Sequence, residues 1–337
     1  MTTPLNNRRW RLVRRPEGDI AAGDLEFTTA PVPALAAGEV LVRNVYLSLD
    51  PTHRIWMSDR DQYLPPVEIG AVMRGGGIGV VEDTRSERFA RGDIVSVGLG
   101  GWEDYTVASE RQLGRVRRLD GVPLTAHLSV LGSTGLTAWY GMIDIGQPKA
   151  GETVVVSAAA GAVGSVAGQL ARRRGARVVG IAGGAAKCRW LVDELGFDAA
   201  IDYRAEDVGA ALDRLCPEGI DVCFENVGGP IFDAILLRMK LHGRISLCGL
   251  IADYDSPRPI TNFAQILMRR LRIEGFIILD FVDRFADTTA KLAGWIAEGR
   301  LKNRVHVIEG FERLPDALRA LVGGDSPNLG KMVVKIP

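Results

Sequence analysis

Hydrophobic residues in the first third of the chain occur as short runs separated by glycine, proline and aspartate. Examples are EVLVRNVYLSL (residues 39–49), GGGIGVVED (75–83) and GDIVSVGL (92–99). Short apolar runs bounded by turn-forming residues are typical of strands joined by tight connections. The pattern predicts a compact, mostly antiparallel β-domain.

The pattern changes in the middle of the chain, where short apolar runs alternate with helical segments. The runs are TVVVSAA (153–159), ARVVGIAG (176–183), AAIDY (199–203), DVCFENV (221–227) and GRISLCGL (243–250). Strands that alternate with helices form a parallel, doubly wound sheet. Such strands are apolar on both faces because helices cover both sides. The pattern in the middle of the chain therefore predicts an α/β domain with a parallel, doubly wound sheet.

The last part returns to a strand–helix–strand pattern in residues 304–324 and 330–337. One domain boundary is expected near Pro123, where a helical pattern begins, and a softer one near residue 305. No internal repeat or low-complexity linker interrupts the chain. At 337 residues the chain has room for two domains.

Composition excludes several classes of partner. The 41 Lys and Arg residues balance 41 Asp and Glu residues, which gives no long-range attraction to nucleic acid or anionic membranes. The densest basic run, residues 172–174, falls in a helical pattern and is expected on a solvated face. No apolar run approaches the roughly 18 residues of a membrane span. The basic start lacks the apolar core of a signal peptide; a transit peptide is the alternative to the predicted cytoplasmic location.

The sequence lacks the residues of the two common mechanisms of alcohol oxidation, one based on a zinc ion and the other on a Tyr-x-x-x-Lys pair. The first domain has His53 and His127 but no cysteine, and the chain has no C-x-x-C pair. No tyrosine is followed by lysine at the Tyr-x-x-x-Lys spacing. We therefore expect no catalytic metal. The four cysteines are interpreted as core or surface residues: Cys188, Cys216, Cys223 and Cys248.

A turn of small residues follows the strand predicted at 153–157. It runs from Ala158 to Gly164 and leads into a helix. Small residues let backbone amides approach a pyrophosphate at the positive end of a helix. Ala158 occupies the place of the usual first glycine of the dinucleotide fingerprint. A merely tight turn is the alternative, but the β-α-β context favours nucleotide binding.

The end of the second strand of this unit indicates which nucleotide is bound. It carries no Asp or Glu for a ribose 2′-hydroxyl; instead Gly183 and Gly184 precede Lys187 and Arg189. An open turn beside cations favours a 2′-phosphate, and therefore NADP. Lys187 as an ordinary surface residue is the alternative. Tyr203 is expected over the adenosine end or buried in the domain.

Several motifs occur together in a familiar order. They are YLSLDP (46–51), YLPPVEIGAVMRGGGIGVV (63–81), GLTAWYG (135–141), AAAGAVGSVAGQLA (158–171), GFDAAIDY (196–203), FENVGG (224–229), GRISLCGLIADY (243–254), IEGFI (273–277) and NLGKMVVK (328–335). With these motifs the chain resembles the zinc-independent medium-chain dehydrogenases/reductases. Within that family it is most similar to the alkenal and prostaglandin double-bond reductases and the bacterial NADPH-dependent curcumin reductases.

The resemblance implies a GroES-like catalytic domain (residues 1–123 and 306–337) and an NADP-binding Rossmann domain (124–305). It also implies cofactor contacts at Gly161, Ala162, Val163, Gly164, Lys187, Tyr203, Asn226, Cys248, Gly249, Leu250, Ile251, Tyr254, Phe276, Ile277, Ile278 and Asn328. Two departures are visible. Glu225 stands where many relatives have aspartate, and one extra residue separates Lys187 from Leu195.

By the same resemblance, NADPH gives a hydride to the β-carbon of an α,β-unsaturated ketone or aldehyde. Tyr254, with the nicotinamide ribose hydroxyl, is the expected hydrogen-bond donor to the developing enolate oxygen. The α-carbon then takes a proton from water or through Tyr254. The alternative for Tyr254 is a loop tyrosine that only caps a turn.

Substrate and partners are less constrained by the sequence. A loop with Trp56, Met57 and Tyr63, and a segment at Phe281, are expected to line a site for an apolar substrate, although loop aromatics also pack onto their own domain. A quinone reductase of the same superfamily and a non-catalytic NADPH-binding relative are the competing functions. The resemblance implies a homodimer formed through an edge strand in residues 270–279.

Overall fold

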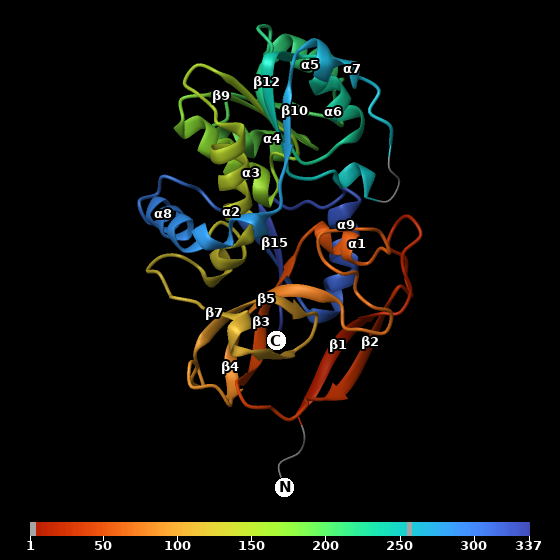
Figure 1. The fold of residues 1–337 in the computed structure, drawn as a ribbon, viewed down its shortest axis with the longest axis vertical. Coiled ribbons are helices and arrows are strands. Elements are labelled where there is room, and N and C mark those ends of the chain that lie inside the picture. The colour runs from red at the N-terminus through yellow and green to blue at the C-terminus, as the bar shows by residue number, and fades with distance from the viewer. Residues whose placement is uncertain (1–4, 255–257) are drawn as a thin grey trace. The chain divides into compact units, whose positions relative to one another are not determined.

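The computed structural model describes residues 5–254 and 258–337. The chain divides into two compact units, drawn in Figure 1. Unit 1 contains Met1–Leu128, Val305–Pro327 and Met332–Pro337, and unit 2 contains Ser129–Arg304 and Asn328–Lys331. Each unit is described separately below.

Unit 1 is built on antiparallel strands. Within its described residues, the strands and helices are β1 (Asn6–Leu12), β2 (Leu25–Pro31), β3 (Glu39–Leu49), α1 (Thr52–Trp56), β4 (Arg74–Thr84), β5 (Ile94–Gly101), β6 (Tyr105–Ser109), β7 (Leu113–Arg115), β14 (Val305–Glu309), α9 (Leu314–Val322) and β15 (Lys331–Lys335). The main sheet has the order β14-β15-β3-β4-β5-β7, with β6 paired to β3, and β1 and β2 form a separate hairpin. The strand predictions for the first third and the C-terminal part are confirmed.

The larger core of unit 1 lies beneath helices α1 and α9. It joins residues far apart in sequence: Leu12, Leu47, Met57, Trp102, Phe311, Leu318 and Val334 are all buried in one cluster. The C-terminal strand β15 lies between β14 and β3, so the end of the chain is part of the same sheet as its first third. A second cluster of β-branched and aromatic side chains fills the other part of the sheet, around Val42, Val95 and Phe89.

Unit 2 contains the parallel sheet. Its strands are β8 (Thr153–Val156), β9 (Arg177–Ala182), β10 (Ala199–Asp202), β11 (Ile220–Glu225), β12 (Met239–Leu247) and β13 (Arg272–Gly275). Its α-helices are α2 (Ser133–Trp139), α3 (Ala162–Arg173), α4 (Ala185–Arg189), α5 (Val208–Leu215), α6 (Gly229–Leu236), α7 (Ala264–Met268) and α8 (Phe285–Ala297). Two π-helical turns, at residues 140–146 and 190–194, continue α2 and α4.

The parallel sheet has the strand order β10-β9-β8-β11-β12-β13, and all pairs in it are parallel. The order reverses at β8, where successive strands add first on one side and then on the other. In such sheets ligands bind beyond the carboxyl ends of the strands at the reversal point. Figure 1 shows α2 and α3 on one side of this sheet and α5 and α6 on the other.

Coverage of both faces explains the apolar strand sequences. In β8, all of Val154, Val155 and Val156 are completely buried. Val155 packs with residues of α5 and α6, whereas its neighbours alternate to the opposite face. The predicted doubly wound α/β arrangement is confirmed. Among the described residues, no helix is long and apolar enough to cross a membrane.

Candidate functional site

The turn between β8 and α3 has the geometry of an anion-binding turn. Ala158 adopts a left-handed backbone conformation with φ 46°, and its carbonyl accepts a 2.9 Å hydrogen bond from the Gly161 N–H. Gly161 caps α3 without a side-chain hydrogen bond. No capping side chain therefore occupies the N–H groups in the first turn of this twelve-residue helix. Free N–H groups at a helix N-terminus can bind a phosphate group.

Gly164 allows the close approach of this helix to the strand. A β-carbon at Gly164 would lie 2.5 Å from the Ala158 carbonyl oxygen and 2.9 Å from the Ala159 Cα. Backbone atoms cannot yield at such distances, so this position requires glycine. By contrast, the absent first glycine is replaced by Ala158 in a conformation that costs an L-residue about 1 kcal/mol.

The residues expected at the adenosine end lie where β9 and β10 end. A β-carbon at Gly183 would lie 2.8 Å from the Tyr203 hydroxyl oxygen, so the tyrosine ring lies against the glycine turn. Asp202 Oδ1 accepts the N–H groups of Gly184 at 2.7 Å and Arg204 at 3.1 Å. The structure thus brings Tyr203 and the Gly183–Gly184 turn together.

Two cations lie beside this turn. Burial lowers the pKa of Lys187, and the positive charge of Arg204 lowers it further. The Arg204 guanidinium also lies 5.9 Å from the centre of the Tyr203 ring. Cationic side chains beside a glycine turn suit the binding of a phosphate group. Sequence reasoning missed Arg204, although a cation directly after Tyr203 was a usable signal; Arg189, which it did name, is exposed on α4.

Asn226 joins the ends of β8 and β11. Its backbone N–H donates to the Ser157 hydroxyl at 2.8 Å, and its side-chain amide donates to the Ser157 carbonyl at 2.7 Å. Its own carbonyl accepts the N–H of Ile251 at 3.2 Å. Asn226 therefore lies at the carboxyl edge of the sheet, between the end of β8 and the segment that follows β12.

The segment after β12 places Tyr254 at the same edge. The Tyr254 hydroxyl lies near Gly249: a β-carbon at Gly249 would be 3.4 Å from both that hydroxyl and the Asn226 carbonyl oxygen. Ala252 N–H donates to the Val227 carbonyl at 2.9 Å. These contacts, within unit 2, bring Cys248, Gly249, Leu250, Ile251 and Tyr254 next to Asn226.

Asn328 belongs to a segment near the end of the sequence that contacts the turn before α3. It is buried, and its side-chain amide donates to the Gly330 carbonyl at 2.8 Å. The Gly330 N–H in turn donates to the Ala160 carbonyl at 2.9 Å. The segment 328–331 thus lies beside the turn that precedes α3.

Phe276, Ile277 and Ile278 directly follow β13 and are partly buried. The Phe276 ring packs beside Phe224, since a β-carbon at Gly141 would meet both rings within 2.6 Å. Phe281 stacks on Tyr140, with ring centres 4.3 Å apart and planes 6° from parallel. Phe281 is thus already packed against an aromatic partner of its own unit.

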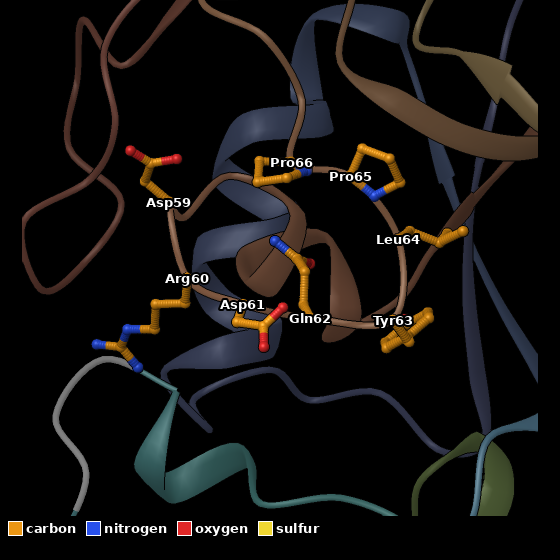
Figure 2. A pocket seen from close by; sticks show the side chains of 8 residues that line it. All are labelled: Asp59, Arg60, Asp61, Gln62, Tyr63, Leu64, Pro65 and Pro66. Atoms are coloured by element: carbon orange, nitrogen blue, oxygen red, sulfur yellow. The ribbon is translucent and has the colours of Figure 1, made fainter.

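The other expected substrate residues lie in unit 1, around the loop shown in Figure 2. Trp56 and Met57 are buried in the core, whereas Tyr63 is 39% exposed. The Trp56 indole N–H donates to the Tyr63 hydroxyl at 3.2 Å, and the same hydroxyl bonds Thr52. Residues 59–66 line a surface hollow. Tyr63 is the member of the three with a side chain at the surface of its unit.

The cysteines occupy core or half-buried positions, as do the histidines of the described residues other than the exposed His242. His53 is completely buried; its Nδ1 accepts the Asp50 N–H at 3.3 Å, and its ring packs edge-on against Trp102. Burial raises the pKa of Cys188 to about 11, and burial and Glu225 raise that of Cys248 to about 12. Over residues 5–254 and 258–337, no group of three or more His, Cys, Asp or Glu could hold a metal ion.

Comparison with known proteins agrees with this geometry. Residues 8–116 match the family model for the N-terminal domain of oxidoreductase, and residues 162–297 match that for zinc-binding dehydrogenase. The chain is 40% identical to the NADPH-dependent curcumin reductase of Escherichia coli, over 98% of this chain and 97% of the relative. It is 36% identical to prostaglandin reductase 1 of Mus musculus, over 97% and 98%.

A solved structure, that of CurA from Vibrio vulnificus in complex with NADPH, superimposes with a TM-score of 0.91 at 41% identity, covering 98% of this chain and 99% of the other. The expected arrangement of a GroES-like domain and a Rossmann domain is confirmed by this match and by the two family models. The chain therefore belongs to the medium-chain dehydrogenase/reductase family of oxidoreductases, among the curcumin and prostaglandin reductases.

Proposed function

We propose that the chain uses NADPH to reduce the carbon–carbon double bond of α,β-unsaturated ketones or aldehydes, without a metal ion. The observation that carries the proposal is the meeting of Tyr254, Asn226 and the turn before α3 at the carboxyl edge of one parallel sheet. This is the edge at which such sheets bind nucleotides. Relatives named for NADPH and for curcumin or prostaglandin reduction support it.

The residues present fit NADPH. The turn Gly161–Gly164 would hold the pyrophosphate, because Gly164 admits no side chain and α3 offers its amides. Lys187 and Arg204 would hold the 2′-phosphate, and Tyr203 would lie at the adenosine end. The remaining proposed contacts are Asn226, Cys248, Gly249, Leu250, Ile251, Phe276, Ile277, Ile278 and Asn328.

NADPH, when bound, supplies the hydride that the β-carbon of the substrate receives. The chain's own contribution is to stabilise the negative charge that develops on the substrate's carbonyl oxygen. The Tyr254 hydroxyl would donate a hydrogen bond to that oxygen, and a fixed donor of this kind lowers the barrier as the charge develops. The α-carbon then takes a proton from water or through Tyr254.

An apolar enone or enal is the proposed substrate. Tyr63 would contribute an exposed aromatic surface held in place by Trp56, whereas Met57 is buried in the core of the same unit. Phe281, stacked on Tyr140, would supply a second apolar surface. Aromatic side chains suit flat, apolar ligands.

The first test follows NADPH absorbance with a simple aliphatic enone, with and without a chelator, and identifies the product by mass and NMR. We expect chelator-insensitive oxidation of NADPH and a saturated ketone. An allylic alcohol would show carbonyl reduction and exclude the proposed mechanism. Turnover of quinones but not enones would favour a quinone reductase, and tight NADPH binding without any turnover would favour a non-catalytic relative.

Tyr254→Phe tests the proposed donor. Removal of one such donor lowers kcat by roughly 10²–10³, while NADPH affinity should change little because the ring remains. Unchanged kcat in the variant would assign Tyr254 a purely structural role.

We also propose a homodimer formed through the β13 edge of unit 2. Strand β13 ends the sheet order, and the neighbouring Phe263, Leu267 and Met268 are 64%, 72% and 61% exposed. Exposed apolar clusters of this kind mark protein interfaces. Light scattering should give a dimer that Leu267→Glu dissociates; a wild-type monomer would overturn this. The cytoplasmic location and the boundaries at residues 123/124 and 305/306 stay predictions.

A further inference from the structure

Glu225 ends strand β11 and is completely buried. Its Oε1 accepts the N–H groups of Val227 and Gly228, each at 2.6 Å. The carboxylate therefore folds the Asn226–Gly228 segment back over the end of its own strand. Short bonds from N–H groups to a carboxylate are stronger than those to a neutral oxygen.

The same residue binds two other segments of the site. The Ser157 hydroxyl, at the end of β8, hydrogen-bonds the Glu225 carboxylate. The Glu225 backbone carbonyl accepts the N–H groups of Cys248 at 2.9 Å and Gly249 at 3.2 Å. Glu225 thus contacts each of the segments that follow β8, β11 and β12, and these carry the proposed cofactor contacts and Tyr254.

A buried carboxylate is costly unless its hydrogen bonds compensate for lost hydration. Glu225 takes no part in the proposed hydride and proton transfers, and its side chain does not reach solvent. Its bonds instead go to backbone and hydroxyl groups of the segments it joins. This distribution is that of a residue that fixes the arrangement of its neighbours.

We propose, on the basis of the NADPH site described above, that Glu225 is a positioning residue whose ionised carboxylate holds Asn226–Gly228 in the arrangement that binds NADPH, so that its protonation weakens NADPH binding. The segment after β12 depends on the same arrangement, because its N–H groups donate to the carbonyls of Asn226 and Val227.

The surroundings of Glu225 bring the pKa of its carboxyl close to physiological pH. Burial raises the pKa of Glu225 to about 7, and the hydrogen bonds from Gly228, Val227, Ser157 and Cys223 oppose that rise. The Cys223 thiol lies 3.7 Å from Oε2. Burial and Glu225 raise the pKa of both the Cys223 and the Cys248 thiol, so both stay neutral near pH 7.

One further carboxylate lies near the segment that Glu225 holds. A β-carbon at Gly228 would lie 2.4 Å from Asp253 Oδ2. Asp253 therefore faces Gly228 from the segment after β12. Every variant in the test keeps Asp253, so that a change in NADPH binding cannot come from this second carboxyl.

The test measures the dissociation constant of NADPH by nucleotide fluorescence from pH 6 to 8.5. Wild type, Glu225→Gln and Asp221→Asn are compared. Asp221 is a matched control because it lies at the opposite end of β11 and also accepts a backbone N–H, that of Thr153, at 2.8 Å. The 2′-phosphate of NADPH itself titrates near pH 6, but it does so equally in all three proteins.

We expect the wild-type affinity to rise roughly tenfold between pH 6 and 8, since a charge-assisted bond adds on the order of one decade. Glu225→Gln should bind about tenfold more weakly at pH 8 and show only the phosphate's pH dependence, whereas Asp221→Asn should follow wild type. A Glu225→Gln profile that matches wild type would overturn the proposal. If wild type bound no NADPH at any pH, the proposed function itself would be wrong.

Glu225→Asp provides a second variant in case the glutamine protein does not fold. It keeps an ionisable carboxyl on a shorter side chain, so NADPH binding should weaken yet remain pH-dependent, with a shifted midpoint. Wild-type affinity and midpoint in Glu225→Asp would contradict a positioning role that depends on these 2.6 Å contacts.

Discussion

The Asn226 side-chain amide donates to the Ser157 backbone carbonyl at 2.7 Å, while the Ser157 hydroxyl accepts the Asn226 N–H at 2.8 Å. These two residues directly follow the neighbouring parallel strands β8 and β11. Their pairing extends the register of β8 and β11 into the segments that we propose to bind NADPH. The shape of the site therefore depends on side chains beyond the last residue of each strand.

Ser157→Ala should weaken NADPH binding about tenfold and lower the free energy of unfolding by about 1–3 kcal/mol, because it leaves the part-buried Asn226 N–H without its acceptor and removes the hydroxyl's bond to Glu225. Fluorescence titration and denaturant unfolding measure the two effects. Ser165→Ala is the matched control: Ser165 is also buried, but its hydroxyl donates to the carbonyl of Ala162 in its own helix, at 3.4 Å. Equal losses in the two variants would remove the special role of Ser157.

Gly164→Ala should destabilise the fold by about 1–3 kcal/mol, the usual cost of overpacking, and abolish measurable NADPH binding. The added carbon would lie 2.5 Å from the Ala158 carbonyl oxygen. Gly294→Ala is the control, since a β-carbon there meets nothing within 4 Å in helix α8, and it should stabilise by about 0.5–1 kcal/mol. Thermal unfolding distinguishes the two; a neutral Gly164→Ala would contradict the close helix–strand approach.

Lys187→Ala and Arg204→Ala should each raise the Kd for NADPH by about tenfold, with little effect on NADH, because each removes a charge-assisted bond to the 2′-phosphate. The ratio of the two dissociation constants is the quantity to measure. Arg189→Ala, an exposed change on the same helix α4 as Lys187, should leave the ratio unchanged. If NADH and NADPH weakened together in Arg204→Ala, the assignment of Arg204 would fail.

Folding stability should depend on the ionisation of Glu225. Its pKa is raised by burial from 4.5 to about 7 in the folded chain, so between these values the folded state binds more protons than the unfolded state. The free energy of unfolding must then fall by at most about 3 kcal/mol as the pH rises from 4.5 to 7. Above pH 7 it should level off.

Denaturant unfolding at several pH values measures this slope. Glu225→Gln should lose the part of the slope due to this residue and should exceed wild type in stability at pH 8. Burial also raises the pKa of Glu103, which contributes a slope common to both proteins. A wild-type slope retained in full by Glu225→Gln would place the titrating group elsewhere.

The sequence predicted the strands of both units well, because their apolar runs are short and bounded by turn residues. It also located the turn before α3, where small residues leave few alternatives. It did not predict the burial of Glu225, since a glutamate after an apolar strand usually reaches solvent. Its environment depends on Ser157 and Cys248, which come from other strands.

The sequence also did not predict in which direction the side chains of the expected substrate site point. Trp56, Met57 and Tyr63 form one short stretch, yet the first two pack into the core and only Tyr63 is exposed. Arg204 lies near Lys187 because β9 and β10 are neighbours in the sheet. This pairing joins residues from two different strand ends, so the sequence pointed to Arg204 only through its place directly after Tyr203.

The position of residues 328–335 in the fold affects how the two units can form during synthesis. Strand β15 lies between β14 and β3 in unit 1, and Gly330, just before it, donates to Ala160 in unit 2. Domains commonly fold one after another as a chain emerges from the ribosome. Here each unit needs part of the same late segment, so neither unit can be completed before residues 328–335 have been made.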